Sequence, residues 1–200
     1  MFNKPGKKTM PGNQSISAIA AVFLCLLLSC TGETPQPVQL RAAPDTLSVD
    51  AARTMIVDMG FYDFHKHKAG KGIIHQYQLT ADGLAVIDAT TGLMWMRSGS
   101  KIHIPHAQAA NMIDYLNQER FAGHSNWRLP TLEEAMSLLA AAKFENELYI
   151  DPLFDPKQVW IWTSDLYPDG SAWRVFLNEG YCGYYDAKSR SYVRAVRSLP

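Results

Sequence analysis

Histidines, cysteines and late aromatic residues are the side chains of this 200-residue chain whose spacing could support chemistry. The histidines that invite a metal site are His65, His67, His103, His106 and His124. A zinc site needs three or four ligands at about 2 Å from the metal, and no cysteine or clustered carboxylate in the sequence completes such a set. All five fall in expected loops, so we interpret them as solvated residues and predict no metal or other cofactor.

Nucleophilic catalysis has little support in the sequence. Ser164 has no nucleophile elbow around it and no His-Asp pair near it in motif form. Glu133 and Glu134 are adjacent, so on a helix they point about 100° apart and cannot act as a facing acid and base. Cys182 remains as a candidate thiol. We predict a protein that is not an enzyme, with no catalytic residue.

Aromatic side chains crowd the last third of the chain, at Trp160, Trp162, Tyr167, Trp173, Tyr181, Tyr184, Tyr185 and Tyr192. Flat aromatic faces suit sugar rings and hydrophobic anchors of a partner protein. Alternate positions of a strand face the core, so Trp162 and Trp173 are expected to be buried. For the tyrosines, core and surface both stay open. The predicted ligand-binding residues are Tyr167, Asp169, Tyr181, Tyr184, Tyr185 and Asp186.

The distribution of charge argues against a nucleic-acid partner. The formal net charge is zero, yet Lys4, Lys7 and Lys8 precede every acidic residue, which leaves the rest of the chain slightly acidic. Phosphate binding needs a basic face, and no cluster of lysine and arginine occurs downstream.

The N-terminus resembles the signal peptide of bacterial lipoproteins. A basic lead is followed by the apolar stretch 16–28, which is short for a transmembrane helix, and then by Ser29 and Cys30. The resemblance implies cleavage before Cys30 and acylation of its thiol, so that the lipid bilayer is a partner. Several acyl chains are needed for stable anchoring. Thr31, where an Asp would retain the protein in the inner membrane, implies the outer membrane, on its periplasmic or surface face. An ordinary cleaved signal is the alternative. With Cys25 removed and Cys30 acylated, Cys182 has no disulfide partner.

The stretch 126–139 is the expected centre of the fold. Pro130 disfavours helix at the preceding residue, and Thr131 with Glu134 matches a capping box. The spacing of Leu132 and Leu139 belongs to one apolar helical face, which predicts a helix over 131–142.

Short strands surround two central helices, which predicts an α+β fold. The expected helices are 48–59, 105–119 and 131–142, and the expected strands are 73–79, 84–88, 93–96, 159–163, 172–177, 181–185 and 192–197. The predicted organisation is a signal peptide over 1–29, a Pro-containing tether over 30–47, a helix and lead-in strand over 48–83, and one domain over 84–198.

Four motifs in order resemble the Lcl C-terminal domain, a bacterial family of unknown function. They are 86–95 with its Thr-Gly-Leu-Met-Trp, 127–134 with Trp-Arg-Leu-Pro-Thr, 162–164 with Trp-Thr-Ser, and 193–197 with Val-Arg-Ala-Val-Arg. The resemblance implies a fold like C-type lectins and formylglycine-generating enzymes, carried on a lipoprotein or surface protein. Its motif residues, read as structural, are Asp88, Trp95, Trp127, Arg128, Thr131, Glu134, Trp162, Trp173, Arg194 and Arg197.

Departures from the family pattern are small. Ala195 stands where many members have Cys, and the 105–119 helix lacks the Cys that would pair with it. Formylglycine-generating relatives need two cysteines, whereas this chain offers one. The function predicted is a lipid-anchored, non-catalytic domain that binds a glycan or an envelope protein. An enzyme of the formylglycine-related class, hydrolase or oxidase, and a structural envelope scaffold are the alternatives.

Overall fold

The structure is a computed structural model that describes residues 37–200. It is α+β, as predicted, with small antiparallel sheets and short helices. The first sheet has the order β1-β2-β3-β9, formed by Tyr77–Leu79, Ala85–Asp88, Leu93–Met96 and Val196–Ser198. The second has the order β5-β6-β7, formed by Trp160–Leu166, Ala172–Phe176 and Tyr181–Tyr185. A two-stranded sheet pairs β4 (Ile104–Pro105) with β8 (Arg190–Ser191).

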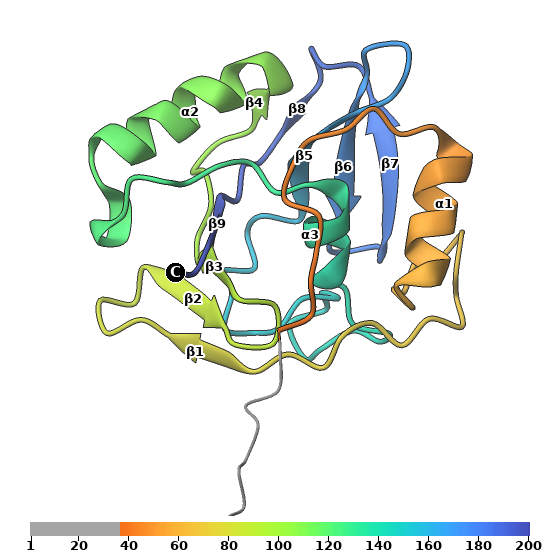
Figure 1. The fold of residues 1–200 in the computed structure, drawn as a ribbon, viewed down its shortest axis with the longest axis horizontal. Coiled ribbons are helices and arrows are strands. Elements are labelled where there is room, and N and C mark those ends of the chain that lie inside the picture. The colour runs from red at the N-terminus through yellow and green to blue at the C-terminus, as the bar shows by residue number, and fades with distance from the viewer. Residues whose placement is uncertain (1–36) are drawn as a thin grey trace, which may run out of the picture. The chain divides into compact units, whose positions relative to one another are not determined.

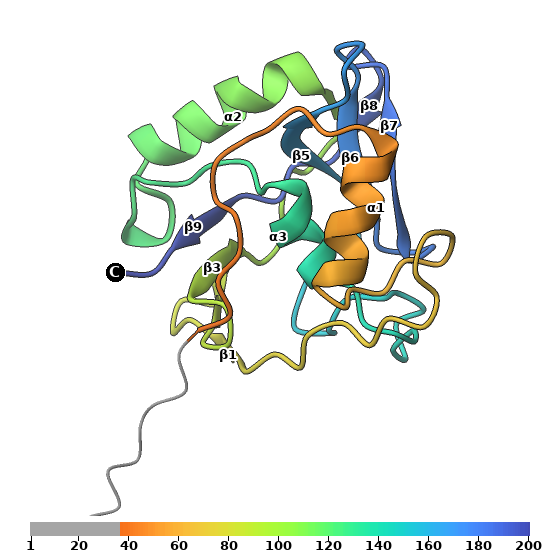
Figure 2. The same cartoon turned by 45° about the vertical axis from the view of Figure 1, so that its right-hand side comes forward.

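The helices are α1 (Val49–Asp58), α2 (His106–Gln118) and α3 (Leu132–Ser137), with a 3₁₀ turn η1 at Phe121–Gly123. Figures 1 and 2 show α3 in the middle of the molecule, with α1 beside it and α2 on the other side. The Ser48 hydroxyl caps α1 by accepting from the Ala51 amide. Ala52 and Ile56, one turn apart on α1, have no exposed surface and face the core.

Two hydrophobic clusters fill the space between these elements. The larger joins α1 and α3 to one face of the β5-β6-β7 sheet, where Trp173, Val175 and Cys182 are buried. The smaller lies under α2 and contains Trp127 and Trp162. The buried positions predicted for Trp162 and Trp173 are confirmed, since both have 0% exposure. Because the two tryptophans lie on neighbouring strands but on opposite faces, one sheet serves both cores.

α3 is shorter than predicted, ending at Ser137 rather than at 142. Beyond it the Ala140 amide donates to the Tyr149 carbonyl at 2.8 Å, so the chain turns to pair with a distant segment. Leu138 and Leu139 are still buried, which explains why their apolar spacing continued the helical pattern. The final strand, predicted over 192–197, also begins later than predicted, because β9 runs only from Val196 to Ser198.

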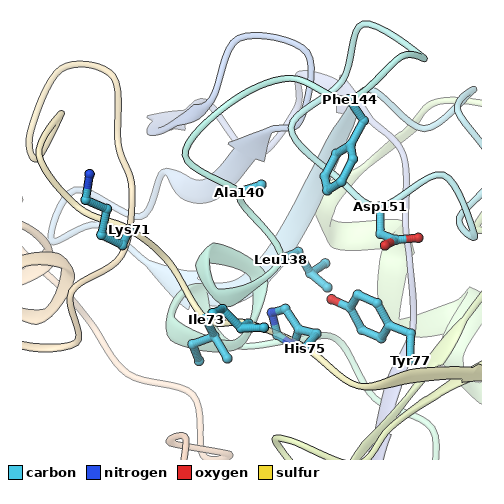
Figure 3. Close-up of a pocket in the computed structure, with 9 residues that line it drawn as sticks. Lys71, Ile73, His75, Tyr77, Leu138, Ala140, Phe144 and Asp151 are labelled. Carbon is cyan, nitrogen blue, oxygen red and sulfur yellow. The ribbon is translucent and has the colours of Figure 1, made fainter.

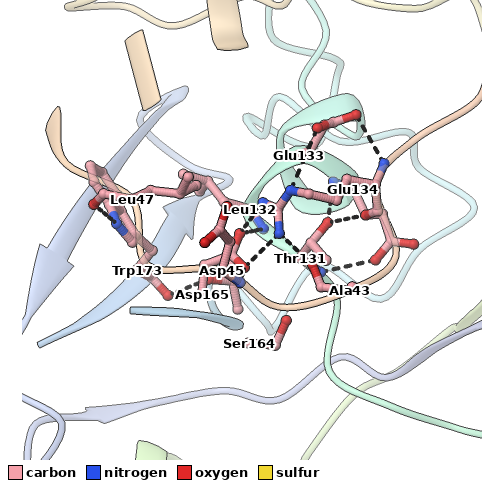
Figure 4. A network of polar contacts seen from close by, with 12 residues as sticks. Ala43, Asp45, Leu47, Thr131, Leu132, Glu133, Glu134, Ser164, Asp165 and Trp173 are labelled. Carbon is pink, nitrogen blue, oxygen red and sulfur yellow. Dashed lines mark hydrogen bonds and ion pairs between the residues drawn. The ribbon is translucent and has the colours of Figure 1, made fainter. Parts of the chain in front are cut away.

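The predicted tether is wrong for residues 37–47, which lie along the domain. Arg41 pairs with Asp165, with Nη1–Oδ1 at 3.0 Å and Nη2–Oδ2 at 2.5 Å, and its amide donates to Glu133 at 3.0 Å. Leu47 is buried and accepts from the Trp173 indole. Figure 4 shows this segment crossing the N-terminus of α3. Proline content suggested an extended chain, and the segment is extended, but it is packed. Cys30 and the signal segment lie outside the described residues.

Candidate functional site

The polar side chains of the central motif, within residues 126–139, form hydrogen bonds that stabilise the fold. The capping box is confirmed: Thr131 Oγ1 accepts from the Glu134 amide at 3.1 Å, and Glu134 Oε2 accepts from the Thr131 amide at 2.9 Å. Arg128 adds a two-pronged ion pair to Glu134, with both distances at 2.6 Å. Glu134 has no exposed surface, so this carboxylate is fully used inside the protein.

Asp165 completes the same network from β5. Its buried carboxylate accepts from the Leu132 amide at 2.7 Å and from the Asp45 amide at 2.8 Å, in addition to Arg41 (Figure 4). The hydrogen bond to Asp165 raises the pKa of Arg41 above its ordinary value. No sequence pattern pointed to the role of Asp165, because its partners lie far away along the chain.

The other motif residues are also inside. Trp95 has no exposed surface, and Arg194 is fully buried with donors to the carbonyls of Met96, Arg97 and Asp155. Burial lowers the pKa of Arg194 to about 10. Arg197 Nε donates to Asn126 at 2.6 Å. These arginines satisfy backbone and amide oxygens, so they are not positioned to contact a ligand.

The predicted binding tyrosines do not form one site. Side chains alternate along β7, so Tyr184 points to the opposite face from Tyr181 and Tyr185. Tyr184 stacks on Tyr167 at 3.8 Å between ring centroids, and both rings contact the buried Trp173. Asp169 and Asp186 each accept from an amide two residues on, in local turns. The stacked rings of Tyr167 and Tyr184 therefore cover the hydrophobic core.

Tyr185 belongs to a cation–π stack on the other face of the sheet. The Arg174 guanidinium carbon lies 3.5 Å from the centroid of the Tyr185 ring and 4.6 Å from that of Phe176. Trp160 lies in the same group, at 5.5 Å from the Arg174 guanidinium. Aromatic faces stabilise the positive charge here, and the stack fixes the orientation of the rings.

Tyr181 lines a pocket at the turn between β6 and β7. This loop pocket has a volume of about 350 Å³ and is lined by Phe64, His65, Lys143, Tyr149, Asn178, Glu179 and Tyr181. The lining comes from three separate segments of the chain, in keeping with the tendency of binding residues to lie on loops of a rigid scaffold.

Backbone hydrogen bonds hold the three segments together. The Phe64 amide donates to Gly180 at 2.8 Å, and the Tyr149 amide donates to Leu177 at 2.7 Å. Gly180 has a φ of +73°, and a Cβ there would lie 2.9 Å from ring atoms of Tyr62 and Tyr149. Only glycine fits this left-handed turn under the two stacked rings. The pocket is thus preformed in the free protein.

Asp63 anchors the first segment from behind. Its buried carboxylate accepts from the amides of His65, Lys66 and Cys182, at 2.7 to 3.0 Å. Burial raises the pKa of the Cys182 thiol to about 12. A thiol that stays protonated at neutral pH is a poor nucleophile, so Cys182 has the properties of a core residue.

The polar groups that line the loop pocket differ in burial and in partners. Asn178 lines the pocket, and its buried Oδ1 accepts no hydrogen bond from the described residues, which is a costly state for a buried acceptor. Lys143 supplies a donor and Glu179 an exposed acceptor. Phe64 is 44% exposed, and the edge of His65 contacts Tyr181 at 4.9 Å between centroids. Aromatic rings therefore line the pocket together with the Asn178 amide, the Glu179 carboxylate and Lys143, whose ammonium lies 3.8 Å from Glu147.

The histidines do not converge. His67 Nδ1 contacts the Phe61 carbonyl at 2.9 Å, His106 Nε2 contacts the Thr163 carbonyl at 2.8 Å, and His103 stacks on Trp160. The interpretation of all five as solvated loop residues is wrong for these three, and His106 is the first residue of α2 rather than part of a loop. Within residues 37–200 no group of three or more histidines, cysteines or acids is placed to hold a metal.

Sequence reasoning missed Phe64, Asn178 and a sixth histidine, His75. Neither Phe64 nor Asn178 belongs to a motif, and they meet only because the Asp63 anchor brings the 60s loop to β7. His75 precedes Tyr77 by two residues, and this strand-like spacing could have signalled a shared face.

Residues 84–197 match the Lcl C-terminal domain family, and this range covers more than half of the chain. The chain belongs to the Lcl C-terminal domain family. Comparisons with curated proteins and with solved structures found no significant match. The recognition from four motifs is confirmed, while the likeness to C-type lectins stays a prediction.

The range that matches the Lcl C-terminal domain contains only some of the residues that line the loop pocket. Tyr149, Asn178, Glu179 and Tyr181 lie within the matched range, but Phe64 and His65 precede it. The family fold supplies one wall of the pocket, and the segment before residue 84 supplies the other. Within residues 37–200, no helix has the length and apolar character required to cross a bilayer.

Proposed function

We propose that this chain is a lipid-anchored protein of the bacterial outer membrane whose Lcl C-terminal domain binds a glycan in the loop pocket. The observation that carries the proposal is Asn178, whose buried oxygen has no partner within residues 37–200, in a pocket that is also lined by the rings of Phe64, Tyr149 and Tyr181. A sugar presents apolar faces that pack on aromatic rings and hydroxyls that donate and accept hydrogen bonds. Few, well-placed polar groups among aromatic walls are typical of small-ligand sites.

The chemistry of each lining group supports a neutral polyol. Asn178 Oδ1 and Glu179 accept from sugar hydroxyls, while Lys143 donates to hydroxyl or ring oxygens. Tyr149 stacks on Tyr62 at 5.3 Å, and Tyr181 stacks on Phe176 at 4.4 Å, so both rings are held rigidly from behind. Rigid rings lose little conformational entropy when a ligand binds.

A non-catalytic role fits the same geometry. Among the described residues, Glu179 is the only carboxylate that lines the loop pocket, whereas glycoside hydrolysis needs a pair of carboxylates across the bond. Cys182 is sealed in the core with a raised pKa. A binding role for an envelope protein partner is the second candidate, favoured by the 44% exposure of Phe64.

A glycan array probed with the full chain tests the proposal. Asn178→Ala and Tyr181→Ala should each lower affinity for any glycan bound by tenfold or more, about the loss expected for a central contact. Tyr184→Ala is the matched control, a tyrosine of the same strand on the opposite face, and should bind normally. If Tyr184→Ala loses binding while the two pocket variants keep it, the site is misplaced.

Lipid anchoring is proposed from Ser29 and Cys30 after the apolar stretch. Mass spectrometry of the membrane fraction should detect a mature N-terminal peptide that begins with acylated Cys30. A Cys30→Ser protein should lose this peptide and leave the membrane fraction. Continued retention of that variant in the membrane would contradict the proposal.

A further inference from the structure

A second cavity lies between the chain leading into β1 and the residues that follow α3. This His75 pocket has a volume of about 290 Å³, and its walls include Ile73, His75, Tyr77, Leu138, Phe144 and Asp151. Figure 3 shows these side chains around one space, with Lys71 directed away from it. Most of the wall is hydrocarbon, so the occupant must be largely apolar.

The imidazole of His75 is fixed and has no free nitrogen. Nδ1 contacts Asp88 Oδ2 at 2.7 Å, and Nε2 contacts the Ser137 carbonyl at 2.7 Å. Both nitrogens are therefore engaged with oxygen atoms of the protein, and neither is left to bond to a ligand. His75 therefore acts as a flat wall of the pocket.

The hydroxyl of Tyr77 is the unused group. The Tyr77 ring stacks on His75 at 4.7 Å between centroids, and its edge meets Phe154 at 5.3 Å. The Tyr77 oxygen is buried and has no hydrogen-bond partner among the described residues. Figure 3 shows this oxygen directed toward the space beside Leu138. A buried hydroxyl without a partner destabilises the free protein, and a ligand that bonds to it removes that cost.

Asp151 sets the charge that the pocket accepts. Its Oδ1 accepts from the Leu153 amide at 2.8 Å, and within residues 37–200 no cation forms an ion pair with it. Burial first, then the negative charges of Asp88 and Asp151, raise the pKa of Tyr77 well above its ordinary value. The cavity thus combines a free carboxylate oxygen with a neutral hydroxyl. An anionic ligand is disfavoured there, and a cation is favoured.

We propose that the His75 pocket binds a small organic ammonium ion with a compact apolar body. The ammonium donates to Tyr77 Oη and to Asp151, and the hydrocarbon body packs on Ile73, Leu138 and Phe144. This site is separate from the loop pocket, so it does not depend on the glycan proposal. Ile73 and His75 precede residue 84, and Leu138 and Asp151 follow it, so this pocket also lies at the edge of the Lcl C-terminal domain.

Calorimetric titration of the full chain with 2-phenylethylammonium and with neutral 2-phenylethanol tests the site. The ammonium should bind at least tenfold more tightly than the alcohol. Asp151→Asn, which keeps the acceptor for Leu153, should remove that preference. Tyr77→Phe should weaken ammonium binding about tenfold, the usual loss of a hydrogen bond to a charged group. Because Tyr77→Phe removes only an unpartnered hydroxyl, its thermal unfolding should be unchanged or shifted upward.

Asp169→Asn is the matched control, since Asp169 also accepts from an amide two residues on, at 2.8 Å, but lies in a different turn. It should bind 2-phenylethylammonium as the unmodified chain does. Equal affinity for the ammonium and the alcohol would overturn the proposal, as would unchanged ammonium binding by Asp151→Asn. Absence of binding by both probes would overturn it too. Loss of the glycan signal with retained ammonium binding would contradict only the loop pocket.

Discussion

The N-terminus of α3 and the loop pocket use the same kinds of polar group for different ends. Around α3, Glu134 and Asp165 are fully buried, and every carboxylate oxygen has at least one donor. At the loop pocket, Asn178 has a buried oxygen that receives no donor from the part of the chain that the structure describes. Polar groups that are hydrogen-bonded within the protein stabilise the fold. A buried group without a partner destabilises it, and a ligand that forms the missing hydrogen bond removes that cost.

The contrast also separates the most recognisable motif from the candidate site. The Trp-Arg-Leu-Pro-Thr motif identifies the family, yet its Arg128 and Thr131 are committed to the helix cap. The loop pocket contains no family motif. Recognition of the domain therefore says where the scaffold is and leaves open what it binds.

Loss of Asp165 should be the most damaging single change in the α3 network. Asp165→Ala removes the acceptor of Leu132, Asp45 and Arg41 together, and it should lower the free energy of unfolding by about 3–5 kcal/mol. Urea unfolding of the full chain measures the change, with Asp169→Ala as an exposed carboxylate control. A loss below about 1 kcal/mol would show that water replaces the carboxylate as the hydrogen-bond partner. The polar groups at the N-terminus of α3 would then contribute less to stability than their contacts suggest, and the contrast with the loop pocket would weaken.

Loss of the helix cap should have a smaller effect. Thr131→Ala removes the Oγ1 that accepts from the Glu134 amide and donates to the Arg41 carbonyl. The free energy of unfolding should fall by about 1–2 kcal/mol, seen as a lower urea midpoint at unchanged slope. Thr131→Ser keeps the hydroxyl and should recover most of the loss. An unchanged midpoint for Thr131→Ala would mean that the segment 37–47 holds α3 without the cap.

The contribution of Cys182, in the core behind the loop pocket, to the stability of the fold should change with pH only under alkaline conditions. The pKa of Cys182 is raised from 9.0 to about 12, so the folded state retains a proton that the unfolded state loses between these values. Stability should be unaffected below pH 9 and should fall as pH rises from 9 toward 12. Cys182→Ala should show a shallower decline in urea midpoint over that range.

Thiol labelling provides the control for this last effect. Iodoacetamide at pH 8 should leave Cys182 unmodified in the native chain and modify it in urea, as peptide mass spectrometry can show. Rapid native labelling would mean that the core behind the loop pocket opens readily, which would weaken the case for a preformed site.

The sequence by itself determined the α+β class, the capping box and the membership of the family. These depend on local patterns: Thr131 and Glu134 are three residues apart, and the four motifs stand in order along the chain. The alternation of side chains between the two faces of β7 is also a local pattern. Applied residue by residue, it places Tyr184 and Tyr181 on opposite faces of the sheet. The point at which α3 ends does not follow from a local pattern. Leu138 and Leu139 continue the apolar spacing of the helix, while the backbone after them turns to pair with Tyr149.

Only the tertiary structure decided where the two pockets lie. Each forms where the segment before residue 84 meets the Lcl C-terminal domain, so Phe64 faces Tyr181, and Tyr77 shares a cavity with Asp151. These partners are separated by tens of residues, and loop closure over such distances leaves no periodicity in the sequence. A polar atom is unpaired only with respect to everything packed around it, so the free oxygens of Asn178 and Tyr77 become visible only in the folded chain.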